Sequence, residues 1–187
     1  MGRDKLTLKI GDDTILDRVY AALAPRCAEV LVVDAGGQVP AGARQIPDLR
    51  PREGPLAGIE AGLFAASHRP VFVAAGDMPF LTSDLVGGLL GLLSESVPAV
   101  VPDLGNRPHP LCAAYGRELR HAVNAALDAG TRSMRDFLEN LPGVLYVGEK
   151  ELERFGDPNL LLTNVNSPKD LARARAVLRE NPASYGG

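Results

Sequence analysis

Four apolar runs of the sequence are each followed by polar residues whose types can bind metals or phosphates. Asp34 follows "VLVV", Asp48 follows "RQIP", Asp77 follows "VFVAAG", and Asn164 and Asn166 follow "LLLT". In an open α/β sheet, ligands bind beyond the carboxyl ends of the strands, so we expect these five side chains to converge. For any one of them the simpler interpretation is a turn, because Asp and Asn initiate turns. As a set, they favour a binding site.

Asp77 carries the sharpest chemical signal. Its carboxylate follows a predicted buried strand and precedes Met78 and Pro79, which should hold it rigidly. Mg²⁺ prefers one or two carboxylates together with phosphate oxygens and waters. The sequence therefore predicts a magnesium ion on Asp77 beside a nucleoside triphosphate.

Lys5 and the glycines of "GPLAGIEAGL" offer complements to phosphate. A lysine beside a loop can offset charge that develops on phosphate oxygens, although a solvated surface role for Lys5 stays open. Gly54, Gly58 and Gly62 are spaced by four residues. Gly54 is expected to let backbone N–H groups at a helix start face a nucleotide. The alternative is that these glycines let the helix pack closely on the sheet.

His109 lies in the rigid turn "NRPHPL". Because no nucleophile is its neighbour in sequence, we assign it a positional or substrate-contact role rather than a catalytic one.

Composition narrows the class of protein. The chain of 187 residues has 23 acidic and 20 basic residues and a net charge of −3, which does not favour nucleic acid as the main partner. Cys27 and Cys112 lack metal-ligand spacing, and two reduced, buried thiols are favoured over a disulfide or a nucleophile. No signal peptide or run of about 18 apolar residues is present, so we expect no membrane association and a cytoplasmic location.

Strand-like and helix-like segments alternate along the chain. Strands are expected near residues 6–10, 30–33, 44–48, 71–75, 99–102, 111–115, 144–147 and 160–163, and helices near 15–23, 54–67, 83–93, 118–129, 132–140 and 168–178. Thr14 with Asp17, and Ser167 with Asp170, have the spacing of helix caps. The pattern predicts a three-layer α/β domain with a mostly parallel sheet.

Five segments together resemble the molybdenum cofactor guanylyltransferases: "MGRDK", "GPLAGIEAGL", "GDMPFL", "HPLCAAY" and "NVNSPKDLARA". They occur in that family in the same order and at similar spacing. The resemblance covers nearly the whole chain and implies a Rossmann-like nucleotidyltransferase fold. It also implies a single domain over residues 1–178, with 179–187 as a flexible tail.

The resemblance implies that the protein transfers GMP from GTP to the terminal phosphate of molybdopterin with Mg²⁺ and releases pyrophosphate. Transient contact with molybdoenzymes or cofactor-synthesis proteins would follow. A cytidylyltransferase acting on the same cofactor is an alternative, because few contacts set the choice of base. A non-catalytic pterin-binding homologue is another.

The resemblance also implies roles for individual residues that match the motifs of the family. Lys5 matches the lysine that contacts the phosphates, Asp77 the metal-binding aspartate, and Asp48 the aspartate before the glycine loop. Asp34 falls where many members have Asn at the nucleotide. Asn164 and Asn166 match paired asparagines on the pterin side.

In the family, a hydrophobic strand and a glycine-rich phosphate loop precede "MGxDK". We therefore expect the natural protein to be longer, with Met1 as an internal methionine of that motif. The sequence is then N-terminally truncated relative to the family. Its sheet would lack a central strand, and catalysis by the 187-residue form would be weakened.

Overall fold

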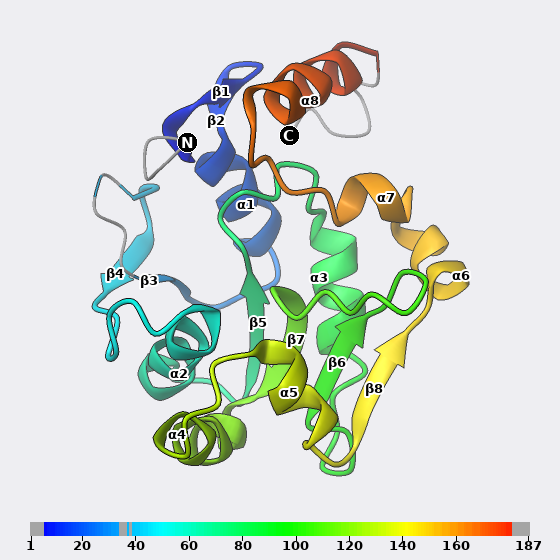
Figure 1. Ribbon diagram of the computed structural model, residues 1–187. Coiled ribbons are helices and arrows are strands. Elements are labelled where there is room, and N and C mark those ends of the chain that lie inside the picture. Colours follow the sequence, from blue (N-terminus) through cyan, green and yellow to red (C-terminus); the bar gives the residue numbers. More distant parts are fainter. Residues whose placement is uncertain (1–5, 34–36, 38, 181–187) are drawn as a thin grey trace.

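Strands and helices alternate in the fold as the sequence predicts. The computed structural model describes residues 6–33, 37 and 39–180 (Figure 1). Its strands are β1 (Lys9–Ile10), β2 (Asp13–Thr14), β3 (Val30–Val33), β4 (Ala43–Ile46), β5 (Pro70–Ala74), β6 (Ala99–Pro102), β7 (Cys112–Gly116) and β8 (Val144–Val147). Its α-helices are α1 (Ile15–Leu23), α2 (Pro55–Ala65), α3 (Ser83–Leu90), α4 (Arg120–Asp128), α5 (Met134–Glu139), α6 (Glu149–Leu152), α7 (Pro158–Leu161) and α8 (Pro168–Glu180).

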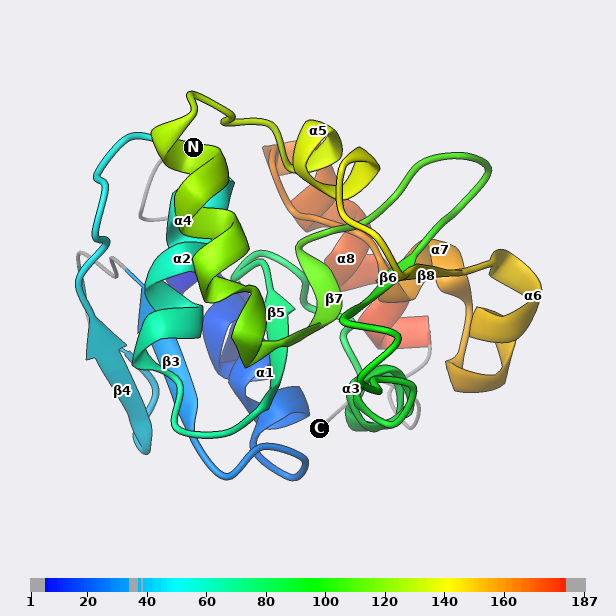
Figure 2. The same cartoon turned by 90° about the horizontal axis from the view of Figure 1, so that it is seen from below.

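The main sheet has the strand order β5-β7-β6-β8 and helices on both faces. Figure 2 shows α2 and α4 on one face and α1 and α3 on the other. Alternate residues of the central strands supply two cores. Val100 and Ala114 pack with α3 residues, whereas Val101 and Ala113 pack with residues of α2 and α4. This period-two alternation produces the predicted three layers.

The sheet is mixed because β7 runs against both of its neighbours. It pairs antiparallel with β5 and with β6, while β6 and β8 are parallel. β5, β6 and β8 therefore end at the same edge of the sheet. The predicted α/β fold class is confirmed, with parallel strands in a mixed sheet.

The strands β3 and β4 form a separate parallel pair. Both views place this pair beyond β5, on the side away from β7 (Figures 1 and 2). No strand among the described residues pairs with the second edge of β3 or β5. All four residues of β3 are only half-buried, whereas every residue of β6 and β7 is buried. The strand expected before Met1 stays a prediction.

Two helix starts form as the sequence predicts. Thr14 Oγ1 accepts the Asp17 N–H at 3.0 Å, and Asp17 Oδ2 accepts the Thr14 N–H at 3.3 Å. At α8, Ser167 Oγ accepts the Asp170 N–H and Asp170 Oδ2 accepts the Ser167 N–H. Each reciprocal pair satisfies backbone donors that a helix start leaves without partners.

The prediction of a strand at residues 160–163 is wrong. Residues 158–161 form α7, because Asp157 caps the turn by accepting the Asn159 N–H at 2.9 Å and Pro158 occupies its first position. Several boundaries also differ, among them the end of β4, which is Ile46 rather than residue 48. The first strand is only Lys9–Ile10, in a hairpin with β2, and α3 ends at Leu90 rather than Leu93.

Cys27 and Cys112 are free thiols; Cys112 is buried as predicted, whereas Cys27 is only half-buried. Burial raises the pKa of the Cys112 thiol to about 12 and also raises that of Cys27. Within the described residues, no helix has the length and apolar character needed to cross a membrane.

Candidate functional site

Asp77 lies in the turn that follows β5, at the carboxyl edge of the sheet. Its side chain is buried, with 8% of the residue exposed. The Asn164 side-chain amide donates to Asp77 Oδ1 at 2.6 Å, and the Val165 N–H donates to the Asp77 carbonyl oxygen at 2.9 Å. The segment after α7 therefore docks on this turn and fixes the carboxylate. The predicted convergence of Asp77 and Asn164 is confirmed.

Asn166 lies two residues further and in a different environment. It is exposed, and its backbone N–H donates to Asp170 Oδ2 at 3.1 Å in the cap of α8. Hydrogen bonds from Ser167 and from the Asn166 N–H lower the pKa of the Asp170 carboxyl. The two asparagines of "NVN" thus have different surroundings: the Asn164 side chain contacts Asp77, and the Asn166 backbone N–H takes part in the cap of α8.

Asp48 and Gly54 are the two ends of the loop that joins β4 to α2, here called loop 48–54. Asp48 Oδ1 accepts the Arg50 N–H at 2.9 Å, which is the local turn that the alternative interpretation predicts. Gly54 has φ +89° and precedes Pro55, and no side chain caps α2. The first turn of α2 also carries no acidic residue. Pro55 has no N–H and the Ala57 N–H donates to the Gly54 carbonyl oxygen at 3.2 Å, so these two residues offer no free donor to an anion.

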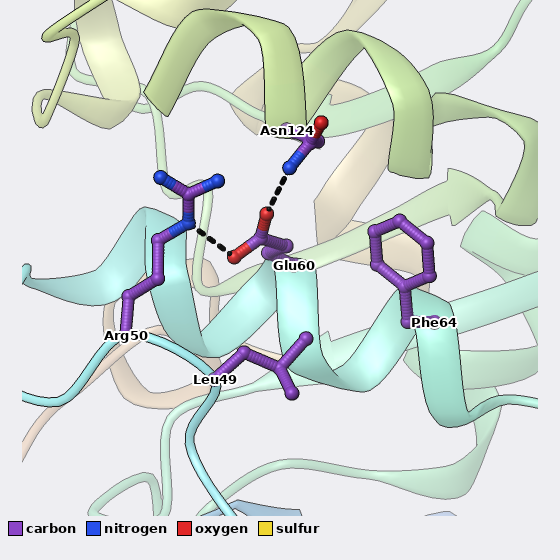
Figure 3. Close-up of a pocket in the computed structure, with 5 residues that line it drawn as sticks. All are labelled: Leu49, Arg50, Glu60, Phe64 and Asn124. Atoms are coloured by element: carbon purple, nitrogen blue, oxygen red, sulfur yellow. Dashed lines mark hydrogen bonds and ion pairs between the residues drawn. The ribbon is translucent and has the colours of Figure 1, made fainter. Parts of the chain in front are cut away.

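Arg50 and Glu60 form an ion pair that the sequence analysis did not anticipate. Arg50 Nε lies 2.9 Å from Glu60 Oε2, and Asn124 Nδ2 donates to Glu60 Oε1 at 2.9 Å (Figure 3). With Leu49 and Phe64, these residues line a hollow of about 410 Å³ beside loop 48–54. The available signal was a single carboxylate within the apolar run "PLAGIEAGLFA" of α2.

His109 lies in the connection between β6 and β7, beyond the carboxyl end of β6. Its N–H donates to the Pro102 carbonyl oxygen at 2.8 Å. Burial lowers the pKa of the half-buried imidazole, Arg107 lowers it further, and Asp103 opposes the shift. The neutral imidazole is thus favoured. His109 follows the carboxyl end of β6, and Asp77 follows that of the parallel strand β5, so both lie at the same edge of the sheet.

Lys5 and Asp34 lie outside the described residues. Among the described residues, no group of three or more His, Cys, Asp or Glu side chains forms a metal-binding cluster. Asp77 offers one fixed carboxylate. That donor set fits the magnesium mode in which phosphates and waters supply the other ligands, and it does not fit a site built of protein ligands alone.

Comparison with known proteins identifies relatives across the chain. A family model described as "MobA-like NTP transferase domain" matches residues 1–144. The "Probable molybdenum cofactor guanylyltransferase" of Pelotomaculum thermopropionicum is 35% identical over 184 residues, covering 97% of this chain and 88% of the relative. The "Molybdenum cofactor guanylyltransferase" of Desulfosudis oleivorans is 29% identical over 184 residues, covering 95% and 89%.

Solved structures give the same picture of the fold. The molybdopterin-guanine dinucleotide biosynthesis protein A of Archaeoglobus fulgidus superposes with a TM-score of 0.77 at 25% identity, covering 94% of this chain and 91% of that one. The 2-C-methyl-D-erythritol 4-phosphate cytidylyltransferase of Thermus thermophilus superposes with a TM-score of 0.71 at 25% identity, covering 94% of each chain.

Proposed function

Because the chain belongs to the family of MobA-like NTP transferase domains, we propose that it transfers the GMP part of GTP to the terminal phosphate of molybdopterin. The observation that carries the proposal is the similarity to curated molybdenum cofactor guanylyltransferases over 94–97% of the chain. These names favour GTP over CTP and a transferase over a non-catalytic binding module.

In the proposed reaction, an oxygen of the molybdopterin phosphate attacks the α-phosphorus of GTP. A new P–O bond forms, the bond between the α-phosphorus and its bridging oxygen breaks, and pyrophosphate leaves with that oxygen. The attacking phosphate is already ionised near neutral pH, so no protein nucleophile is required. The work of the protein is positioning and charge stabilisation.

We assign Asp77 as the ligand of a catalytic Mg²⁺, which when bound would neutralise phosphate charge. Asn164 would hold the Asp77 carboxylate in one orientation through its 2.6 Å hydrogen bond. Such support matters because small displacements of a positioned group slow a reaction strongly.

The remaining residues are assigned to the two substrates. Asp34, Asp48, Gly54 and the start of α2 would bind the nucleotide, and Lys5 would offset charge on the leaving pyrophosphate. His109, Asn164 and Asn166 would contact the pterin side. We place the activity in the cytoplasm and expect transient contact with the molybdoenzymes that receive the product.

A thermal-shift experiment with nucleotide and Mg²⁺ tests the substrate assignment. We expect GTP to raise the Tm more than CTP or ATP at equal concentration, because a ligand that binds only the folded state stabilises it. Stabilisation by CTP alone would contradict the guanylyl assignment.

A further inference from the structure

Loop 48–54 holds Arg52 in a backbone conformation that residues with a Cβ rarely adopt. Arg52 has φ +71° and Gly54 has φ +89°, so two residues of this short loop are in the left-handed region. For Arg52, a residue with a Cβ, this conformation is sterically unfavourable. Such backbone persists only where the surrounding structure imposes it. The contacts that hold the loop in this shape lie on α2 and α4.

The first contact that holds the loop is with Glu60 of α2. The Glu60 carboxylate is buried, and the residue is 2% exposed. Its two oxygens accept from two different parts of the chain, Arg50 of the loop and Asn124 of α4 (Figure 3). A buried carboxylate is stable only when it is paired and hydrogen-bonded. Glu60 therefore requires Arg50 to lie over α2.

A second set of contacts, two ion pairs, joins the loop to the end of α4 and the turn after it. Arg50 Nη2 lies 2.6 Å from Asp128 Oδ1, and Glu53 Oε2 lies 3.0 Å from Arg132 Nη2. Arg132 is itself oriented, because its Nη1 donates to the Leu127 carbonyl oxygen at 2.7 Å. Two ion pairs thus attach the loop to one end of α4. The Arg50 guanidinium faces two carboxylates, Glu60 and Asp128, so it is engaged within the protein.

We propose that Glu60, Asn124, Asp128 and Arg132 are positioning residues that hold loop 48–54 in its nucleotide-receiving shape before GTP arrives. This inference rests on the proposed function, because Asp48 and Gly54 are the residues being positioned. A loop that is ordered in advance binds its ligand without a further cost in conformational entropy. Loss of the fastening should therefore raise KM for GTP more than it lowers kcat.

Asp128→Asn is the variant of choice because the Asp128 side chain is 60% exposed and its replacement leaves the core intact. The matched control is Glu118→Gln, which removes a 46% exposed carboxylate from its ion pair with Arg69 at 2.9 Å. That pair lies where β7 ends and β5 begins, which is the opposite end of β5 from Asp77. Asp128→Glu preserves the charge and serves as the rescue variant.

Two readouts are taken for each variant: hydrogen–deuterium exchange of the amides of residues 50–54 without ligand, and steady-state kinetics with GTP and molybdopterin. For Asp128→Asn we expect loop exchange and KM for GTP to rise about two- to fivefold, with kcat changed by less than about twofold. A fivefold change corresponds to about 1 kcal/mol, the upper value for an exposed ion pair. Glu118→Gln should change neither readout, and Asp128→Glu should restore both.

The outcomes separate this inference from the proposed function. Unchanged loop exchange in Asp128→Asn overturns the inference, whatever the kinetics show. Faster loop exchange with an unchanged KM for GTP also contradicts the positioning role. In that case normal turnover would still support guanylyl transfer. A wild-type protein that releases no pyrophosphate overturns the proposed function and, with it, the assignment of the loop to GTP; the exchange data then report a structural fastening only.

Discussion

The side-chain amide of Asn164 donates to the carboxylate of Asp77 at 2.6 Å, joining residues 87 positions apart in sequence. The contact fastens the segment between α7 and α8 onto the turn after β5, with the Val165 N–H on the Asp77 carbonyl oxygen as a second tie. A hydrogen bond of this kind fixes the direction of the carboxylate. The Asp77 carboxylate is therefore held in one orientation at the turn after β5.

Replacing Asn164 should impair catalysis without unfolding the protein. Asn164→Ala removes the donor, and residues that support a metal ligand typically contribute about 10- to 100-fold to activity or metal affinity. We expect a loss of that size in kcat/KM, measured by pyrophosphate release, together with a higher Mg²⁺ requirement. Asn164→Asp places a like charge beside Asp77 and should be more damaging. Wild-type kinetics in both variants would show that the contact has no role in the reaction.

Arg50→Ala should destabilise the fold because it leaves the Glu60 carboxylate buried with only Asn124 as its partner. Breaking a buried ion pair costs about 3–5 kcal/mol. We expect the lower end, near 3 kcal/mol, since the Arg50 side chain is 23% exposed. Urea unfolding measures this.

Arg44→Ala is the control for Arg50→Ala: its ion pair with Glu29 is more exposed, and its loss should cost less than about 1 kcal/mol. Adding Glu60→Gln to Arg50→Ala should recover part of the stability. Equal effects of the two arginine substitutions would contradict the account of Glu60.

Gly58→Ala and Gly62→Ala should each stabilise this chain. Both glycines lie inside α2, and a Cβ built on either meets no atom within 4 Å. Alanine in a helix interior is favoured over glycine by about 0.5–1 kcal/mol. Thermal unfolding measures the gain. Gly88→Ala in α3 is the contrast, because its Cβ would collide with the Phe155 ring. A loss of stability at Gly58 or Gly62 would mean that another segment packs against this face of α2.

His109 should make stability depend on pH below neutrality. Burial and then Arg107 lower its pKa, so the folded protein binds the proton less tightly than the unfolded chain. The favourable contribution is therefore fully present above the ordinary histidine pKa of about 6.5 and declines as the pH falls below it.

Comparison with His109→Gln isolates this contribution. Between pH 7.5 and pH 5.5, the unfolding free energy of the wild type should fall more than that of the variant. Equal declines in the two proteins would show that His109 titrates alike in the folded and unfolded states.

Local signals allowed much of the fold to be predicted. The caps at Thr14 and Ser167 depend on residues three positions apart, and the buried runs at β6 and β7 have the length and composition of internal strands. The run at residues 160–163 was misassigned because a short apolar run fits a strand or a helix equally well. The Asp157–Pro158 pair, a cap followed by a first-turn proline, was the signal that decides for a helix.

The site was predictable to the extent that it follows from strand ends. Asp77 and Asn164 meet as expected, although the strand expected before Asn164 is the helix α7. The network around Glu60 was not predictable, because its partners are 10 and 64 positions away and only the packing of α4 on α2 unites them. The exposure of Asn166 could not be predicted either, because the "NVN" motif gives no sign that its two asparagines differ in burial.

The most direct test of guanylyl transfer is pyrophosphate release by the purified protein with GTP, Mg²⁺ and molybdopterin, measured in parallel for the wild type and Asp77→Asn. We expect release by the wild type that requires both substrates, and a loss of at least about 100-fold in Asp77→Asn with an unchanged far-UV spectrum. Undiminished release by Asp77→Asn would contradict the assignment of the metal to Asp77. An inert, folded wild type would contradict guanylyl transfer by this chain.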